Sequence, residues 1–204
     1  MLVRAASALL YGLTRFLVGG HARWRGVGPV STQRIYFANH ASHLDTVLLW
    51  AALPPRLRRR THPVAALDYW GTGTLRRFIA LRVLGAVLID RQGASDPLAP
   101  LRATLEQGHS LILFPEGTRR DERLPGPFKS GLFRLATAFP QVELVPVYLE
   151  NLARAFPKGA FLPAPIQCVV NFGAALPRTA EECKDDFLER ARQAVCELAP
   201  EIHP

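Results

Sequence analysis

The stretch Ile35–Trp50 reads IYFANHASHLDTVLLW and predicts a strand, a short turn and a helix. One apolar run precedes Asn39, and a second follows Asp45. Short apolar runs of this kind are typical of buried strands and of helices that pack on them. The polar residues between the two runs would therefore lie where a buried strand ends, at one edge of a sheet.

Apolar runs alternate with stretches of helical periodicity along the rest of the chain. Strands are expected at residues 34–38, 64–67, 86–89, 111–114, 144–148 and 166–172, and helices at 42–53, 75–84, 97–107 and 129–139. Thr179 and Glu182 match a capping box for a last helix that ends near Leu198. This alternation predicts an α/β fold, a single layered domain in which helices flank a mixed, largely parallel sheet.

Length and composition fit one folded domain with a basic surface. The chain has 204 residues, of which 49% are hydrophobic, so it can bury a full core and is not a disordered chain. Its net charge of +8 indicates an anionic partner: a membrane surface, a nucleic acid or a phosphorylated substrate. Arginines cluster at 56–60 and 76–82 among aromatic and apolar residues, which fits a lipid headgroup layer better than a duplex. A solvated arginine-rich surface explains the composition equally well.

Residues 1–25 are expected to form a membrane-interface segment ahead of the main domain at 26–204. Two arginines interrupt the apolar run Leu2–Val18, and the ten residues between them are too few to cross a bilayer. No small-residue cleavage pattern follows, which argues against a signal peptide. One apolar face at helical spacing consists of Leu9, Leu10, Leu13, Phe16 and Leu17. This face predicts an amphipathic helix in the membrane interface, and a helix packed on the domain's own core is the alternative.

His40 and Asp45 form the first candidate catalytic pair. An imidazole can take a proton from a hydroxyl near neutral pH, and a carboxylate partner fixes its tautomer and stabilises the imidazolium. Residues five apart on a helix point about 140° away from each other, so His40 must lie before the helix and Asp45 in its first turn. The strand–turn–helix pattern supplies this arrangement. The alternative is that Asp45 only caps the helix together with Ser42.

Other catalytic chemistries find little support in the sequence. The chain has no Gly-x-Ser-x-Gly nucleophile elbow. Cys168, Cys183 and Cys196 lack the spacing of a metal site and are expected to be reduced packing residues in a cytosolic compartment. His43 could join the histidine–aspartate pair as a metal ligand, but no further ligand follows at a familiar spacing. We therefore expect direct transfer to an acceptor that a base activates, with no metal.

A second polar loop follows the strand expected at 111–114. Gly117 permits close approach of the backbone to a ligand, and Arg119 can bind two phosphate oxygens at once. Arg91 directly follows the strand expected at 86–89 and could reach the same edge of the sheet. The alternative is that these arginines pair with surface carboxylates such as Glu116, which is the usual role of a single arginine.

Four segments, in this order, resemble the four blocks of the glycerolipid acyltransferase family, specifically the 1-acylglycerol-3-phosphate acyltransferases. The first block is the His-x4-Asp motif of His40 and Asp45. The other three are residues 85–91 (GAVLIDR), 114–119 (FPEGTR) and 145–147 (VPV), and residues 128–131 (FKSG) also fit. The resemblance covers residues 30–150, and the ordered set is far more specific than any single block.

The resemblance implies a role for each matched residue. His40 would be the general base on the acceptor hydroxyl, and Asp45 would orient it. Pro146 would shape the wall of the active site or the acyl region. The acceptor's glycerol phosphate would be bound by Arg91, Glu116, Gly117, Thr118 and Arg119. The donor would be an acyl thioester on coenzyme A or acyl carrier protein, without a cofactor or a metal.

The implied reaction transfers a fatty acyl group to the free hydroxyl of a lysophosphatidic acid-like acceptor and gives phosphatidic acid for phospholipid biosynthesis. The protein would work peripherally on an anionic membrane, at the cytoplasmic face of the bacterial inner membrane, with no nucleic-acid partner. An acyl thioesterase and a non-catalytic module that binds anionic lipid remain as alternatives. The chain departs from the family at Arg120, where a small polar residue is common, and at 68–73, where a basic stretch is usual.

Overall fold

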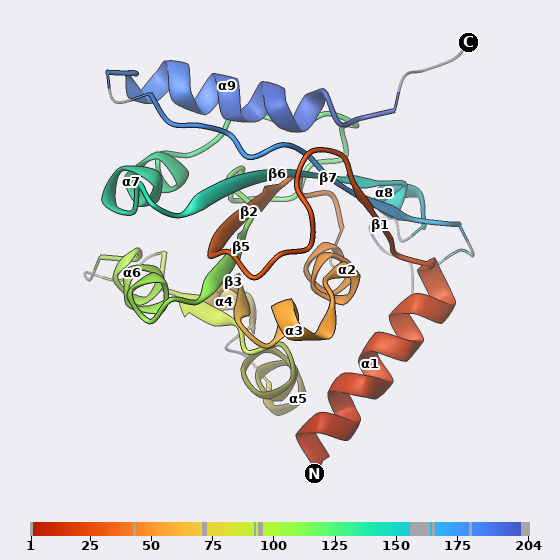
Figure 1. The fold of residues 1–204 in the computed structure, drawn as a ribbon. Helices are drawn as coiled ribbons and strands as arrows, with labels where there is room; N and C mark the ends of the chain where they lie inside the picture. The colour runs from red at the N-terminus through yellow and green to blue at the C-terminus, as the bar shows by residue number, and fades with distance from the viewer. Residues whose placement is uncertain are drawn as a thin grey trace.

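The centre of the molecule is a mixed β-sheet with helices on both faces (Figure 1). The structure, a computed structural model, describes residues 2–42, 44–70, 73–91, 93, 96–155, 164, 166–179 and 181–200. Within these ranges the sheet has seven strands in the order β1-β7-β6-β2-β5-β3-β4. They are β1 His21–Trp24, β2 Arg34–Ala38, β3 Thr61–Ala66, β4 Val87–Ile89, β5 Ser110–Leu113, β6 Glu143–Glu150 and β7 Val169–Phe172.

Helices connect most of these strands. The α-helices are α1 Leu2–Val18, α2 Asp45–Ala52, α3 Pro55–Arg58, α4 Leu67–Trp70, α5 Thr74–Phe78, α6 Ala99–Glu106, α7 Gly131–Ala138, α8 Leu152–Ala155 and α9 Lys184–Cys196. One π-helical segment, η1 Ile79–Val83, continues α5. The predicted α/β fold with a mixed, largely parallel sheet is confirmed. Among the described strands, β4, β3, β5, β2 and β6 run parallel, β1 is parallel to β7, and only the β6–β7 pair is antiparallel.

The strand β2 shows how the sheet separates two cores. Its alternate residues Ile35 and Phe37 pack with α6, α7 and α9, whereas Tyr36 and Ala38 pack with α2 on the opposite face. All four side chains are at most 1% exposed. This two-sided burial explains why the strand is apolar from Ile35 to Ala38. It also fixes the end of β2 rigidly, so the residues that follow leave the sheet at a defined point.

Several element boundaries differ from the sequence prediction. The helix expected at 42–53 is α2, which begins at Asp45, three residues after the predicted start at Ser42. Asp45 turns its carboxylate back toward the preceding turn. The predicted cap of the last helix is wrong: Glu182 pairs with Arg190, and the Cys183 sulfur accepts from the Asp186 N–H instead. The prediction also missed β1, α3, α4 and α8, which are short. Residues 21–24, assigned to the N-terminal segment, form the edge strand β1.

The helix α1 divides its apolar residues between two environments. Leu10, Tyr11 and Leu17 pack on the core beside α2, as the alternative interpretation expected. Leu9, Leu13 and Phe16 stay exposed, at 72%, 49% and 86%. None of the helices in the described ranges has the length and apolar character needed to cross a bilayer. The exposed half of this helix is therefore available to a partner.

Two histidines pair at the edge of the sheet where β3 and β5 begin. The Nδ1–H of His62 donates to the Gly85 carbonyl (2.7 Å), which leaves its Nε2 to accept from Nδ1–H of His109 (2.8 Å). Burial lowers the pKa of His109, and the neighbouring His62 and Arg60 act in the same direction. The folded protein therefore holds His109 neutral.

This pair predicts a loss of stability in mild acid. An unfolded histidine titrates near about 6.5, and His109 titrates lower in the folded protein, so between these values the unfolded chain binds more protons. The free energy of unfolding should fall as pH decreases from about 7 through this window. Urea denaturation at several pH values would measure the slope. The slope should shrink in His109→Asn and persist in His21→Asn, and equal slopes would contradict the prediction.

Candidate active site

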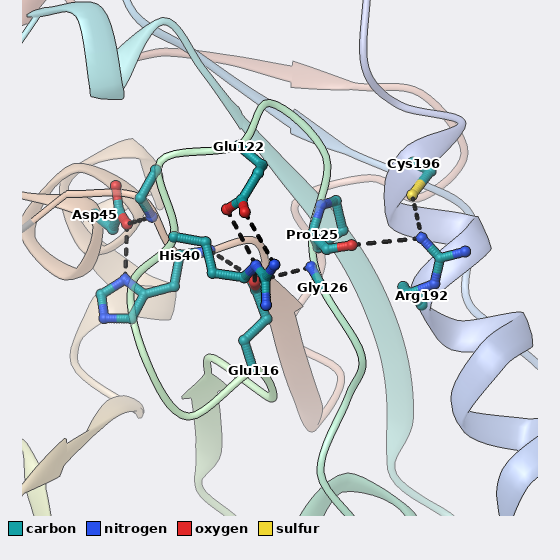
Figure 2. A network of polar contacts seen from close by, with 10 residues as sticks. His40, Asp45, Glu116, Glu122, Pro125, Gly126, Arg192 and Cys196 are labelled. Atoms are coloured by element: carbon teal, nitrogen blue, oxygen red, sulfur yellow. Dashed lines mark hydrogen bonds and ion pairs between the residues drawn. The ribbon is translucent and has the colours of Figure 1, made fainter.

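The candidate site begins where β2 ends. His40 follows this strand by two residues, and Asp45 is the first residue of α2. Figure 2 shows the His40 ring facing the Asp45 carboxylate, with 2.7 Å between Nδ1 and Oδ2. The same Oδ2 accepts from the backbone N–H groups of Ala41 (2.6 Å) and Ser42 (2.8 Å). The geometry required for a histidine–carboxylate pair is thus present.

The hydrogen bonds at Asp45 decide the tautomer of His40. Asp45 is fully buried, and its Oδ2 accepts from two backbone N–H groups as well as facing the imidazole. A carboxylate only accepts, so Nδ1 of His40 must carry the hydrogen. The lone pair then lies on Nε2, which can take a proton from a hydroxyl. The capping alternative and the catalytic interpretation therefore describe one structure, in which the turn N–H groups help to hold the carboxylate.

The backbone of His40 is held by the loop that follows β5. Its N–H donates to Oε1 of Glu116 (2.8 Å), and its carbonyl accepts from the Arg120 N–H (2.9 Å). The imidazole stacks on Phe114 with ring centroids 4.4 Å apart. Asn39, one residue earlier, exchanges two hydrogen bonds with the backbone of Leu149 in β6. The position of the base is therefore determined by three strands of the sheet.

A cavity of about 610 Å³ opens beside the His40 ring. Its apolar wall includes Val64, Ile89, Leu98, Leu101, Leu113 and Leu132, from both strands and helices. Its polar wall includes Arg91, Gly117, Thr118, Arg119, Lys129 and Arg134. The cavity thus combines an imidazole, a cationic region and an apolar region at one site.

Residues 25–150 match the acyltransferase family. The chain belongs to this family. The resemblance to the glycerolipid acyltransferases seen in the four sequence blocks is thereby confirmed.

Two relatives of the chain are named as 1-acyl-sn-glycerol-3-phosphate acyltransferases. The chain is 30% identical over 146 residues to 1-acyl-sn-glycerol-3-phosphate acyltransferase alpha of Homo sapiens, covering 70% of this chain and 47% of the human one. It is 28% identical over 177 residues to the 1-acyl-sn-glycerol-3-phosphate acyltransferase of Limnanthes douglasii, covering 80% and 57%. The chain therefore spans about half the length of these curated relatives.

A solved structure has the same fold. It is the 1-acyl-sn-glycerophosphate (LPA) acyltransferase PlsC from Thermotoga maritima, at a TM-score of 0.73 and 18% identity. The match covers 96% of this chain and 79% of that one. At this identity the likeness concerns the fold.

Four of the five residues that family resemblance assigned to phosphate binding line the cavity beside His40. They are Arg91, Gly117, Thr118 and Arg119. An Arg91 nitrogen donates to the carbonyl of Gly117 (2.6 Å) and another lies 3.8 Å from Asp68, so its side chain crosses between the second and third family blocks. Gly117 adopts a positive φ of 71°.

Glu116 has a different position from the one expected of a phosphate-site residue. Its carboxylate is buried, with 4% of the residue exposed, and is not part of the cavity wall. One oxygen accepts from the His40 N–H and the other from the Gly126 N–H (3.0 Å). Burial raises the pKa of Glu116, while these N–H groups, His40 and Arg120 act in the opposite direction. Its two hydrogen bonds are with the protein backbone, and the Arg120 guanidinium lies 4.0 Å away.

Pro146 in the fourth block also differs from expectation. It lies within β6, opposite Phe37, where its carbonyl accepts from the Gly173 N–H, and it is not part of the described cavity wall. Its place is in the sheet that supports the site.

Sequence reasoning missed three contributions to the site. Lys129 was noted only as part of a motif, yet a methyl group added at Gly117 would lie 2.7 Å from its ammonium nitrogen, so this cation covers the glycine. The stacking of Phe114 and the backbone bonds of Asn39 were also missed. Lys129 follows a loop of irregular path, and spacing alone gave no sign that it returns to the third block.

The remaining candidates for chemistry give weaker support. Among the residues that the structure describes, no group of three or more His, Cys, Asp or Glu side chains could hold a metal ion. His43, the possible third ligand, lies outside the described residues. Burial raises the pKa of the Cys168 thiol to about 12, which makes it a poor nucleophile.

Proposed function

We propose that the protein transfers an acyl group from a thioester to the free hydroxyl of a lysophosphatidic acid-like acceptor and forms phosphatidic acid. The observation that carries this proposal is the cavity that joins the His40–Asp45 pair to Arg91, Arg119 and Lys129. A phosphate bound by these cations would hold the glycerol hydroxyl of the same molecule close to the imidazole. The named relatives support the choice of acceptor.

In the proposed reaction, Nε2 of His40 takes the proton of the acceptor hydroxyl as its oxygen attacks the thioester carbonyl. Asp45 stabilises the imidazolium that forms. The tetrahedral intermediate then collapses, the carbon–sulfur bond breaks, and the imidazolium returns the proton to the thiolate. The donor is acyl-coenzyme A or acyl carrier protein, and the residues present supply every proton transfer, so the mechanism requires no further cofactor.

An acceptor comparison tests this function. The purified protein should convert lysophosphatidic acid and an acyl-coenzyme A to phosphatidic acid, identified by mass spectrometry. Monoacylglycerol, which lacks the phosphate, should react with a kcat/KM at least about tenfold lower, because a charge-assisted hydrogen bond contributes about 1.5–3 kcal/mol. Thioester hydrolysis at the same rate with and without lysophosphatidic acid would instead identify a thioesterase.

The proposed acceptor is an amphiphile, so we place the enzyme peripherally on an anionic membrane, at its cytoplasmic face. The exposed Leu9, Leu13 and Phe16 of α1 and the exposed Leu75, Phe78 and Leu81 of α5 and η1 support this placement. The two helical segments are neighbours, since α1 contacts η1 and the Ser7 hydroxyl donates to the Val83 carbonyl (3.4 Å). Arg76, Arg77 and Arg82 are sequence neighbours of Leu75, Phe78 and Leu81 and are also exposed.

The other arginine cluster is a weaker candidate for lipid headgroups. Arg56 donates to the Pro29 carbonyl (2.5 Å). The guanidinium of Arg58 lies over the rings of Tyr11 and Trp50, at 4.1 and 5.0 Å from their centroids. These two arginines at 56–60 therefore have roles within the fold.

Vesicle flotation tests the membrane placement. The protein should float with anionic vesicles at low salt. The double variant Leu9→Asp/Phe16→Asp should bind at least about a hundredfold more weakly, since each large apolar side chain contributes about 1.5–3 kcal/mol when it leaves water. Val30→Asp changes another exposed apolar residue, at 48%, outside both helices and should bind like the wild type. Equal flotation of all three proteins would contradict the placement.

A further inference from the structure

The loop from Pro115 to Gly126 carries charges that the proposed reaction does not use. Figure 2 shows Glu116 beneath this loop, between the backbone of His40 and that of Gly126, with Glu122 above it. Both carboxylate oxygens of Glu116 are occupied by N–H groups. An ionised carboxylate can accept both hydrogen bonds, whereas a protonated one carries a hydrogen on one oxygen and opposes one donor. The ionisation state of Glu116 therefore affects how the base is held.

Arg120 supplies the nearest positive side chain in this loop. Its Nε lies 4.0 Å from Oε2 of Glu116. The guanidinium is fixed from the outside by Glu122, with bonds of 3.0 and 3.2 Å. It lies flat against Gly126, where an added methyl group would be 2.7 Å from one of its nitrogens. Arg120 is thus held beside the carboxylate.

Arg120 also contacts the base through its own backbone. Its N–H donates to the His40 carbonyl, so both main-chain polar groups of His40 are bound by residues 116 and 120. Arg192 of α9 anchors the far end of the loop by donating to the Pro125 carbonyl (3.4 Å) (Figure 2). Arg120 therefore contacts the turn that carries His40 through its backbone and approaches Glu116 through its guanidinium.

We propose that Arg120 is a positioning residue for the base: its guanidinium keeps the buried Glu116 ionised, and Glu116 then holds the backbone of His40. This inference rests on the proposed role of His40. The titratable or charged side chains that face Glu116 are those of His40, from the turn after β2, and Arg120, from its own loop. Burial works against the ionised form, so removing the guanidinium favours protonation of Glu116. One bond to the loop or to His40 is then lost.

The test is the pH dependence of kcat in Arg120 variants. Arg120→Gln removes the charge and keeps a long polar side chain, and Arg120→Ser removes the charge together with most of the side chain. In both variants, the midpoint of the acidic limb of the kcat–pH profile should lie at least about one pH unit higher than in the wild type. At a pH on that limb, kcat should then be about tenfold lower. KM for the acceptor should stay within about twofold. Arg120→Lys restores the charge and should return the acidic limb toward that of the wild type.

Arg190→Ser is the matched control. Arg190, on the outer helix α9, forms two hydrogen bonds with Glu182, at 2.6 and 2.7 Å. Replacing Arg190 removes a similar ion pair at a place away from His40. Its kcat profile should match the wild type. Thermal unfolding should show that each assayed variant is folded.

Three results would overturn the inference: a wild-type profile in both neutral variants, a change confined to KM, or no recovery in Arg120→Lys. An active His40→Ala protein would instead overturn the proposed function. An inactive His40→Ala protein together with wild-type profiles in the Arg120 variants would overturn this inference alone.

Discussion

The His40→Ala protein is expected to fold and to transfer acyl groups at least about a hundredfold more slowly than the wild type, because general-base catalysis contributes about 10²–10⁴ to such rates. The loss should appear in kcat, since the imidazole acts on the hydroxyl during the reaction and the cations of the cavity remain. Steady-state kinetics with lysophosphatidic acid and an acyl-coenzyme A would measure it.

His21→Ala is a suitable control for this measurement. His21 lies exposed on the edge strand β1, so its removal should leave kcat unchanged. Circular dichroism and a thermal unfolding curve would show that the His40→Ala protein is folded. A folded His40→Ala protein with full activity would exclude the imidazole as the base.

The Asp45→Asn protein is expected to lose about a thousandfold or more in kcat with little change in KM. The amide oxygen can still accept from the N–H groups of Ala41 and Ser42, so the turn before α2 should keep its shape. The amide has no charge to stabilise the imidazolium, and it does not fix the His40 tautomer that carries its hydrogen on Nδ1. The base then spends more time in the wrong tautomer, or loses the support that lets it accept a proton.

A matched comparison separates this effect from a change in overall charge. Asp186→Asn removes one carboxylate from the first turn of α9, outside the cavity wall, and should leave kcat unchanged. Histidine ring nitrogens can be followed by ¹⁵N NMR in both proteins. A wild-type tautomer and a wild-type kcat in Asp45→Asn would show that Asp45 acts only as a structural residue of the turn.

The part of the fold that sequence could predict is the part in which pattern determines burial. The apolar residues of β2, β5 and β6 identified central strands, and the His-x4-Asp spacing placed a base and its partner on either side of a turn. Element ends were less predictable, because competition between neighbouring polar groups decides them. Asp45 accepts from two preceding N–H groups and is the first residue of α2, whereas Cys183 caps α9 and Glu182 pairs with Arg190.

Most residues of the candidate site could be named from the sequence, but the directions of their side chains could not. Arg91 and Arg119 follow parallel strands, so their meeting beside His40 followed from topology. The direction of the Glu116 side chain did not, because a carboxylate after a strand can turn to the cavity or to the backbone. The apolar cavity wall comes from several elements separated in the chain, and no local pattern records such a surface.

The packing of α1 bears on how the protein could be made more soluble. Deleting the first twenty residues would remove exposed apolar side chains, but it would also uncover the part of the core that Leu10 and Leu17 close. The guanidinium of Arg58 would lose the Tyr11 ring and rest on Trp50 alone. A truncated chain would lose one exposed apolar surface and gain another, next to α2, the helix that carries Asp45. Polar substitutions at the exposed positions of α1 would keep the contacts of Leu10, Tyr11 and Leu17 with the core. They are the better route to a more soluble enzyme.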